Sequence, residues 1–210
     1  IRKVSGVEMP EVKANLRLAG ALYDKRKEGE FWYAIHTRDA ILDLKKEKPD
    51  IYMAAFDIGT TTVVGYLLSA ENGKVCAIES CMNPQTQYGA DVIMRANYAL
   101  EDGTEVLSNC IQTAIDELLH KLAAKVKAQP EAICQVSVVG NTCMHLLFLG
   151  ITPGSLVHAP YNPAYSERLT LQAADYGLHI HPLAQLLMLP DIAGYVGADT
   201  CGCLLALRQD

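Results

Sequence analysis

The chain has 210 residues, of which half are hydrophobic and a fifth are charged, with a net charge of −6. This composition supplies enough apolar side chains for the core of one or two domains and excludes a disordered or low-complexity protein. The acidic balance argues against nucleic acid as a partner, and no apolar run reaches the roughly 20 residues of a membrane span. We therefore expect a protein that binds neither nucleic acid nor membranes.

Seven cysteines are distributed along the chain without the spacing of a small disulfide-rich secreted domain. Their odd number predicts a reducing compartment, and the N-terminus lacks the apolar stretch of a signal peptide, so we expect a cytoplasmic protein. The chain begins at Ile1 rather than Met and stops at Asp210, just after an expected helix begins. We interpret it as a piece of a longer protein.

Charge divides the sequence near Pro49. The first 50 residues have a net charge of +2, whereas the remaining 160 have a net charge of −8 and a much lower density of charge. Helical spacing of apolar residues predicts one helix over 12–27, and a second helix can begin at Thr37 or Asp39 and end at the lysines that follow. Fifty such residues make a poor core alone, so we predict a charged linker or satellite segment, followed by the main domain over 51–210.

After this boundary the pattern is that of an α/β domain. Runs of β-branched and apolar residues predict three strands over 51–58, 61–69 and 74–80. The short glycine-containing turns between them predict an antiparallel meander. Apolar residues at helical spacing then predict a helix over 91–100 and a longer helix over 106–126.

The last part of the chain mixes regular and irregular segments. A buried strand over 132–139 and a short helix over 144–149 complete the order β-β-β-α-β-α. The residues from there to Pro190 are rich in proline and predict irregular structure. A final strand is expected over 186–196, and a helix is expected to begin at Gly197.

The first candidate site consists of Asp57, Gly59, Thr60, Thr61 and Thr62, at the turn between the first two expected strands. Glycine lets backbone N–H groups approach an anion, threonine hydroxyls add donors, and a carboxylate can bind a metal ion or orient water. The string is not a Walker loop, because it lacks the lysine and the following helix. An ordinary hairpin is as compatible with residues 57–62 alone, but the β-β-β-α-β-α order around them favours a phosphate-binding hairpin.

Two strand-to-helix junctions supply further candidates. The turn Gly140-Asn141-Thr142 can approach phosphate or magnesium-bound water, or it can be a simple turn in which Asn141 or Thr142 caps the helix. Asp199 follows Gly197 at the start of the last expected helix. A helix N-cap is the favoured interpretation of Asp199, and a catalytic carboxylate is the alternative.

Several other polar residues are expected to be structural. Asp91 is predicted to cap its helix, with Arg95 four residues later as its partner. Cys110 lies on the apolar stripe of the long helix and is predicted to be in the core. Cys201 and Cys203 point in different directions if they lie in a helix, so we expect core packing rather than a metal pair.

Five strings in this part of the chain resemble segments of one known family. They are Asn-Pro-Gln at 83–85, Tyr-Gly-Ala-Asp-Val-Ile-Met-Arg at 88–95, Val-Val-Gly-Asn-Thr-Cys-Met-His at 138–145, Ala-Pro-Tyr at 159–161, and Leu-Pro-Asp-Ile-Ala-Gly-Tyr-Val-Gly-Ala-Asp-Thr at 189–200. The family is that of the reductive activators of corrinoid proteins, within the actin, sugar-kinase and heat-shock-chaperone ATPase superfamily. The resemblance implies a ribonuclease-H-like α/β half-domain with a mixed sheet.

The resemblance also implies a function. These activators couple ATP hydrolysis to one-electron reduction of a Co(II) corrinoid to Co(I) in methyltransferase or O-demethylase systems. It implies ATP and Mg²⁺ as ligands, a corrinoid protein as partner, and a plausible homodimer. By resemblance, Asp57 acts with Mg²⁺ and Asp199 positions water for attack on the γ-phosphate. The resemblance assigns contacts to the β- and γ-phosphates to Gly59, Thr60, Thr61 and Thr62. We add Gly140, Asn141, Thr142 and Gly197 as further candidate nucleotide contacts at the two strand-to-helix junctions.

Two departures from the family pattern shape these expectations. Family members typically begin with an iron–sulfur domain, but residues 1–50 contain no cysteine, so we expect that cluster elsewhere in the parent protein. The second phosphate loop of the family does not occur before Asp210. We therefore expect this chain to form one wall of a nucleotide cleft, with weak or no ATPase activity alone. The alternatives are a metabolite kinase of the same superfold and a non-catalytic nucleotide-binding scaffold.

Overall fold

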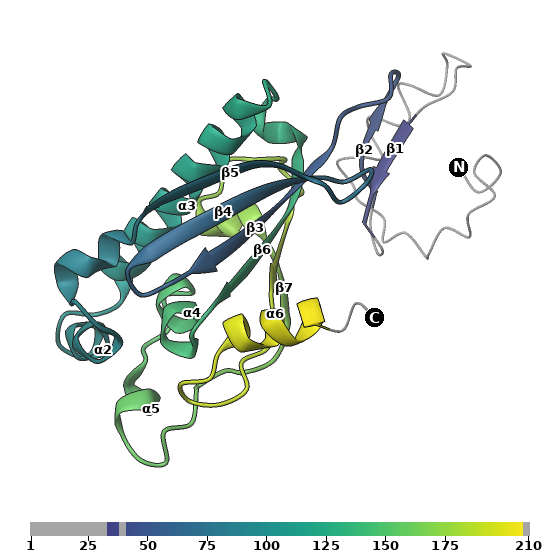
Figure 1. The fold of residues 1–210 in the computed structure, drawn as a ribbon. Coiled ribbons are helices and arrows are strands. Elements are labelled where there is room, and N and C mark those ends of the chain that lie inside the picture. Colours follow the sequence, from purple (N-terminus) through teal and green to yellow (C-terminus); the bar gives the residue numbers. More distant parts are fainter. Residues whose placement is uncertain (1–32, 38–40, 208–210) are drawn as a thin grey trace. The chain divides into compact units, whose positions relative to one another are not determined.

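The computed structural model describes residues 33–37 and 41–207, and the chain forms two compact units, residues 1–49 and 50–210 (Figure 1). In the first unit, strand β1 (Tyr33–His36) pairs antiparallel with strand β2 (Ile41–Lys45). The helix expected to begin at Thr37 or Asp39 is therefore wrong. The apolar run of β2 is too short for a helical stripe, and pairing with β1 satisfies its backbone instead. The helix expected over 12–27 lies outside the described residues.

The second unit is built on a six-stranded mixed sheet with the strand order β5-β4-β3-β6-β8-β7. Its strands are β3 (Tyr52–Ile58), β4 (Thr62–Ser69), β5 (Val75–Met82), β6 (Ile133–Gly140), β7 (Leu169–Gln172) and β8 (Gln185–Met188). The first three form the expected antiparallel meander, whereas β6 pairs in parallel with both β3 and β8. Because β3 and β6 are parallel and adjacent, both end at the same edge of the sheet.

The helices of this unit contact the sheet in different places. They are η2 (Pro84–Tyr88), α2 (Val92–Glu101), α3 (Glu105–Lys125), η3 (Pro130–Ala132), α4 (Thr142–Phe148), α5 (Gly154–Val157), η4 (Ala173–Tyr176) and α6 (Ala198–Leu207). The apolar stripe of α3 packs against β4 and β5, as its periodicity predicts, and α3 also contacts α4. Helix α6 packs against β6, where Gly202 faces the side chain of Val139.

The chain between α4 and α6 differs from the sequence-based expectation. The segment expected to be irregular contains the short elements α5, β7, η4 and β8. The strand expected over 186–196 ends at Met188, because Pro190 has no N–H to continue the ladder. The buried Asp191 then begins an irregular segment that leads to α6.

The expected core positions of three cysteines are also wrong. Cys110 is only half-buried on α3, and Cys203 is exposed on α6, where Cys201 is half-buried. The leucines at 204, 205 and 207 are exposed as well. Helix α6 therefore carries apolar residues on its exposed faces as well as on the face that packs against β6. For this reason its apolar composition predicted more burial than the structure shows.

The packing of α3 makes a prediction about stability. Ile115 lies near the middle of α3 and is fully buried, whereas Val106 near its start is 44% exposed. Replacing Ile115 by alanine removes buried methyl groups and leaves a cavity, so the free energy of unfolding is expected to fall by about 2–5 kcal/mol. Chemical denaturation measures this loss. The matched control Val106→Ala is expected to change stability by about 0.5 kcal/mol or less. Equal losses in the two variants would contradict the assignment of the core.

Candidate functional site

Three segments meet where β3 and β6 end. Ile58 at the end of β3 pairs with Gly140 at the end of β6, which places the β3–β4 hairpin beside the turn before α4. A Cβ atom on Gly140 would lie 2.9 Å from the carbonyl oxygen of Ile58, and one on Gly197 would lie 2.4 Å from the carbonyl oxygen of Gly140. Only residues without a side chain allow this approach. The structure thus brings together the hairpin, the turn before α4 and the start of α6.

The hairpin is held by its carbonyl groups. The N–H of Gly59 donates to the carbonyl oxygen of Thr62 at 3.0 Å, which closes the turn. Asn83 donates from its side-chain Nδ2 to the carbonyl of Gly59 at 2.8 Å and from its backbone N–H to the carbonyl of Thr61 at 2.8 Å. Arg95 donates from Nη2 to the carbonyl of Thr60 at 2.5 Å. Since these four carbonyls and the N–H of Gly59 are already bonded within the protein, the polar groups left to meet a ligand are the other N–H groups of the hairpin and its hydroxyls.

Arg95 has a different role from the one that its spacing predicted. Asp91 does cap α2, because its Oδ1 accepts from the N–H of Met94 at 2.8 Å. Arg95, however, is fully buried, and its Nε donates to the carbonyl of Gly89 at 2.8 Å. No carboxylate forms an ion pair with its guanidinium among residues 33–37 and 41–207. The expected partnership with Asp91 is wrong, since burial directs the guanidinium to the carbonyls behind the hairpin.

The turn before α4 has a mainly structural set of bonds. Asn141 caps α4 by accepting from the N–H of Met144 at 3.1 Å, and its Nδ2 lies 3.4 Å from the hydroxyl of Thr60. The buried hydroxyl of Thr142 donates to the carbonyl of Ala193 at 2.8 Å. The capping interpretation therefore describes Asn141, and the Thr142 hydroxyl is directed to the segment before α6. Gly140 and Asn141 are the residues of this turn that border the hairpin.

Asp199 does not cap α6. The helix begins at Ala198, and the N–H of Ala198 is bound by Oδ1 of Asp191 at 3.0 Å. Asp199 lies in the first turn, where its Oδ1 accepts from the N–H of Thr200 at 2.7 Å. The N-cap expectation is wrong because Asp191, which the sequence analysis did not single out, supplies the cap. Asp199 is left as a carboxylate at the edge of the site.

The two aspartates are electrostatically coupled. Asp57 is exposed to solvent, yet partial desolvation and the nearby carboxylate of Asp199 raise the pKa of Asp57 above its ordinary value. Two like charges held together are relieved by a cation, and Mg²⁺ is commonly bound by one or two carboxylates together with phosphates and water. Within the described part of the chain no group of three or more His, Cys, Asp or Glu side chains could hold a metal ion. The pair therefore fits Mg²⁺ only together with ligands from a phosphate.

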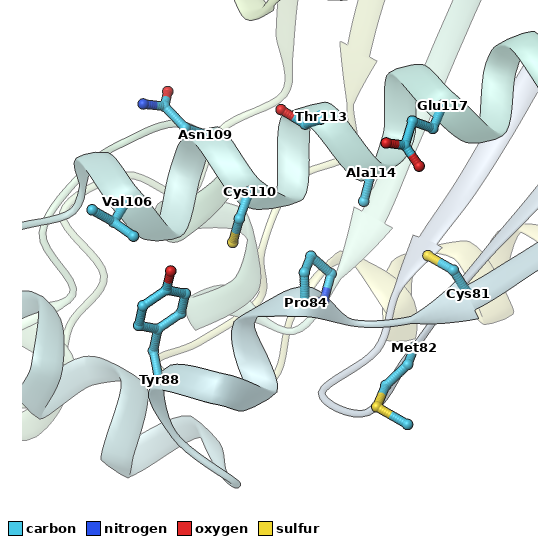
Figure 2. A pocket seen from close by; sticks show the side chains of 10 residues that line it. All are labelled: Cys81, Met82, Pro84, Tyr88, Val106, Asn109, Cys110, Thr113, Ala114 and Glu117. Carbon is cyan, nitrogen blue, oxygen red and sulfur yellow. The ribbon is translucent and has the colours of Figure 1, made fainter.

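A groove between β5 and α3 is a separate feature of the second unit. It has a volume of about 590 Å³ and lies between the end of β5 and α3, with the largely exposed Met82 at its rim. Figure 2 shows the side chain of Cys110 pointing from α3 toward Tyr88, with Cys81 farther along the groove. This explains why Cys110 is not in the core. None of the sequence-predicted site residues lines the groove.

Comparison with known proteins assigns the chain to a family. Residues 52–210 match the RACo middle region family. The chain belongs to that family. This confirms the resemblance to the reductive activators on which the expectations of fold and function were based.

Two longer proteins are similar to this RACo middle region. The corrinoid activation enzyme RamQ of Eubacterium limosum is 36% identical over 174 residues, which cover 82% of this chain and 29% of RamQ. A solved structure named "Reductive activator for corrinoid,iron-sulfur protein" matches with a TM-score of 0.77 and 26% identity, over 96% of this chain and 37% of that chain. The predicted mixed α/β fold is confirmed. The chain spans about a third of the length of these proteins.

The coupled aspartates make a prediction about titration. Asp199→Asn removes the nearby negative charge, so the pKa of Asp57 is expected to fall toward its ordinary value, and Asp57 loses its proton at a lower pH than in the wild type. Carbon NMR of the Asp57 carboxyl group during a pH titration measures the change. Asp175→Asn, on η4, is the control and is expected to leave the pKa of Asp57 unchanged. The same pKa for Asp57 in the wild type and in Asp199→Asn would show that the two carboxylates are not coupled.

Proposed function

We propose that this RACo middle region forms the first wall of an ATP site in a reductive activator of corrinoid proteins. The observation that supports this most is the buried guanidinium of Arg95 behind the hairpin, without a carboxylate partner in the described residues. A buried cation is costly unless negative charge lies near it. The hairpin in front of it offers N–H groups and hydroxyls rather than carbonyls, which suits the phosphates of a nucleotide.

Each part of the site then has a proposed role. Gly59, Thr60, Thr61 and Thr62 bind the β- and γ-phosphates, and Gly140, Asn141, Thr142 and Gly197 form the adjoining part of the nucleotide site. Asp57 would hold Mg²⁺ together with the phosphates, next to the carboxylate of Asp199, and a bound Mg²⁺ would neutralise charge on the phosphates. Asp199 orients the water that attacks the γ-phosphorus, so that the bond to the bridging oxygen of ADP breaks and inorganic phosphate forms.

The comparisons support the class of reaction. RamQ is named as a corrinoid activation enzyme, and the solved relative is named as a reductive activator for a corrinoid, iron–sulfur protein. We propose that the protein containing this segment couples ATP hydrolysis to reduction of a Co(II) corrinoid to Co(I) on a partner protein. The electron comes from an iron–sulfur cluster that this proposal places outside the chain. A homodimer remains part of the proposal.

The proposed setting is the cytoplasm. No disulfide joins any of the seven cysteines, all of which lie in the described residues, and this is compatible with a reducing compartment. No described helix has the length and apolar character needed to cross a membrane. The absence of a disulfide among the described cysteines supports the proposed compartment, and the location itself is a proposal.

Activation assays with the full-length protein test this function. The protein is incubated with a Co(II) corrinoid protein, ATP, Mg²⁺ and a low-potential donor, and the corrinoid absorbance reports formation of Co(I). Asp57→Ala is expected to lower the rate of activation by about 10²-fold or more, because it removes the carboxylate proposed to hold Mg²⁺ at the phosphates. Arg95→Met is expected to weaken ATP binding by about tenfold, because it removes the cation and the bond to Thr60. Asp175→Ala is the control and should behave as the wild type.

The outcomes separate the candidate functions. Unaltered activation by Asp57→Ala would favour a non-catalytic scaffold. Consumption of ATP only when a small metabolite is added, with no Co(I) formed, would favour a kinase of the same superfold. Either result would overturn the proposed function.

A further inference from the structure

A buried histidine–aspartate pair lies beside the start of α6 and has no part in the function proposed above. His145 of α4 and Asp191 of the segment before α6 both have fully buried side chains, and Nδ1 of the histidine lies 3.3 Å from Oδ1 of the aspartate. Burial of two ionisable groups costs desolvation energy that their attraction often fails to offset. Such a pair contributes little to the stability of the fold. We therefore ask which backbone segments it positions.

Asp191 holds the first residue of α6. Its Oδ1, the oxygen that faces His145, also accepts from the N–H of Ala198 at 3.0 Å. Its second oxygen, Oδ2, is buried without a hydrogen-bond partner in the described structure. Neither ring nitrogen of His145 makes a hydrogen bond in the described structure, so Oδ1 is hydrogen-bonded to the start of α6 and lies in close polar contact with the imidazole of α4. Ala198 directly precedes Asp199, so the backbone that carries the site carboxylate is attached to the buried pair.

Two more contacts join the same segments. The hydroxyl of Thr142, at the start of α4, donates to the carbonyl of Ala193 at 2.8 Å. Gly197 lies against the turn before α4, where an added Cβ would be 2.5 Å from the Cα of Asn141. The start of α4 and the start of α6 consequently form one packed block. A change in the buried pair is therefore expected to move Asp199 relative to the hairpin, rather than to loosen a distant loop.

The neighbouring polar groups show that the pair lies in a poorly solvated place. Tyr165 has a buried hydroxyl without a hydrogen-bond partner in the described structure. Burial, followed by the charges of Asp191 and Glu167, raises the pKa of Tyr165 to about 12. Water therefore offers little competition for Oδ1 of Asp191, and its contacts with α4 and α6 fix the local geometry more firmly than they would at the surface.

We propose that His145 and Asp191 are positioning residues that fix the Asp199 carboxylate for ATP hydrolysis. This inference rests on the proposed role of Asp199. The polar contacts of the pair in the described structure go to each other and to Ala198, not to the hairpin or to Asp57, so the pair acts on turnover rather than on nucleotide affinity. Loss of the pair is therefore expected to lower kcat and to leave KM for ATP nearly unchanged.

Variants of Asp191 in the full-length protein provide the first test. Asp191→Ala removes both contacts of Oδ1, and kcat for ATP hydrolysis is expected to fall by about tenfold or more while KM changes by less than about twofold. Asp191→Asn keeps an amide oxygen for the N–H of Ala198 and is expected to retain most of kcat. The matched control is Asp116→Ala. Asp116 also contacts a histidine, with 2.9 Å between its Oδ2 and Nδ1 of His179, and accepts from the backbone N–H of His179, but at the surface.

Variants of His145 test whether the ring nitrogen nearest to Asp191, Nδ1, is the one that matters. His145→Asn places an amide nitrogen near the position of Nδ1, whereas His145→Gln places it near the position of Nε2. The inference predicts that the asparagine variant retains most of kcat and that the glutamine variant loses as much as Asp191→Ala. Thermal unfolding of both variants shows whether they are folded. Equal kcat values in two folded variants would overturn the inference, even where Asp191→Ala does not fold.

Amide hydrogen exchange separates failure of this inference from failure of the proposed function. In the full-length protein, Asp191→Ala is expected to speed exchange at residues 198–200 by about tenfold or more, and Asp116→Ala is expected to leave these amides unchanged. If the wild-type protein does not hydrolyse ATP, the proposed function fails, and with it the role given to Asp199. If the wild type hydrolyses ATP but Asp191→Ala matches Asp116→Ala in kcat and in exchange at these amides, the inference alone is overturned.

Discussion

The candidate site depends on the parallel pairing of β3 with β6. This pairing places Ile58 opposite Gly140, so that the hairpin after β3 and the turn after β6 leave the sheet at the same edge. Glycines allow these backbone segments to approach each other closely, because a side chain at Gly140 or Gly197 would meet backbone atoms at under 3 Å. The start of α6 then fits against the turn before α4. Residues that are more than 130 positions apart in sequence, such as Asp57 and Asp199, become electrostatic neighbours in this way.

The electrostatics of the site follow from what lies behind and in front of the hairpin. Behind it, Arg95 is buried and Asn83 is buried, and both donate to hairpin carbonyls. In front, Asp57 and Asp199 concentrate negative charge. A nucleotide with Mg²⁺ would complement both sides of the hairpin. Its phosphates would accept hydrogen bonds from the hairpin donors, and the metal ion would offset the negative charge of the two carboxylates. This complementarity is the physical basis of the proposed ATP site.

Local signals in the sequence predicted much of the fold. The meander, α3 and the cap of α2 by Asp91 depend on alternation, helical spacing and capping, which act over a few residues. Long-range pairing decided what the sequence could not predict. Residues 41–45 became a strand because β1 pairs with them, and α6 remained exposed on most of its surface because its main packing contact among the described strands is with β6.

The candidate site also combines features that local sequence signals predict with features that depend on long-range contacts. Its hairpin and its two junctions were identified from glycine, threonine and aspartate at the ends of expected strands. Arg95 and Asp191 were missed, because their partners are backbone groups of distant segments. A signal was present for each. Arg95 occupies the apolar face of α2 together with Ala96 and Ala99, and Asp191 follows a proline within an otherwise apolar stretch. A charged residue in such a place has to find polar partners elsewhere in the fold.

The central claim is that the hairpin from Gly59 to Thr62 binds the phosphates of ATP. A crystal structure of the full-length protein with Mg²⁺ and a non-hydrolysable ATP analogue tests it most directly. The account predicts the β- and γ-phosphates within hydrogen-bond distance of the hairpin N–H groups and hydroxyls, with Mg²⁺ next to Asp57. A triphosphate bound elsewhere, with this hairpin unliganded, would contradict it.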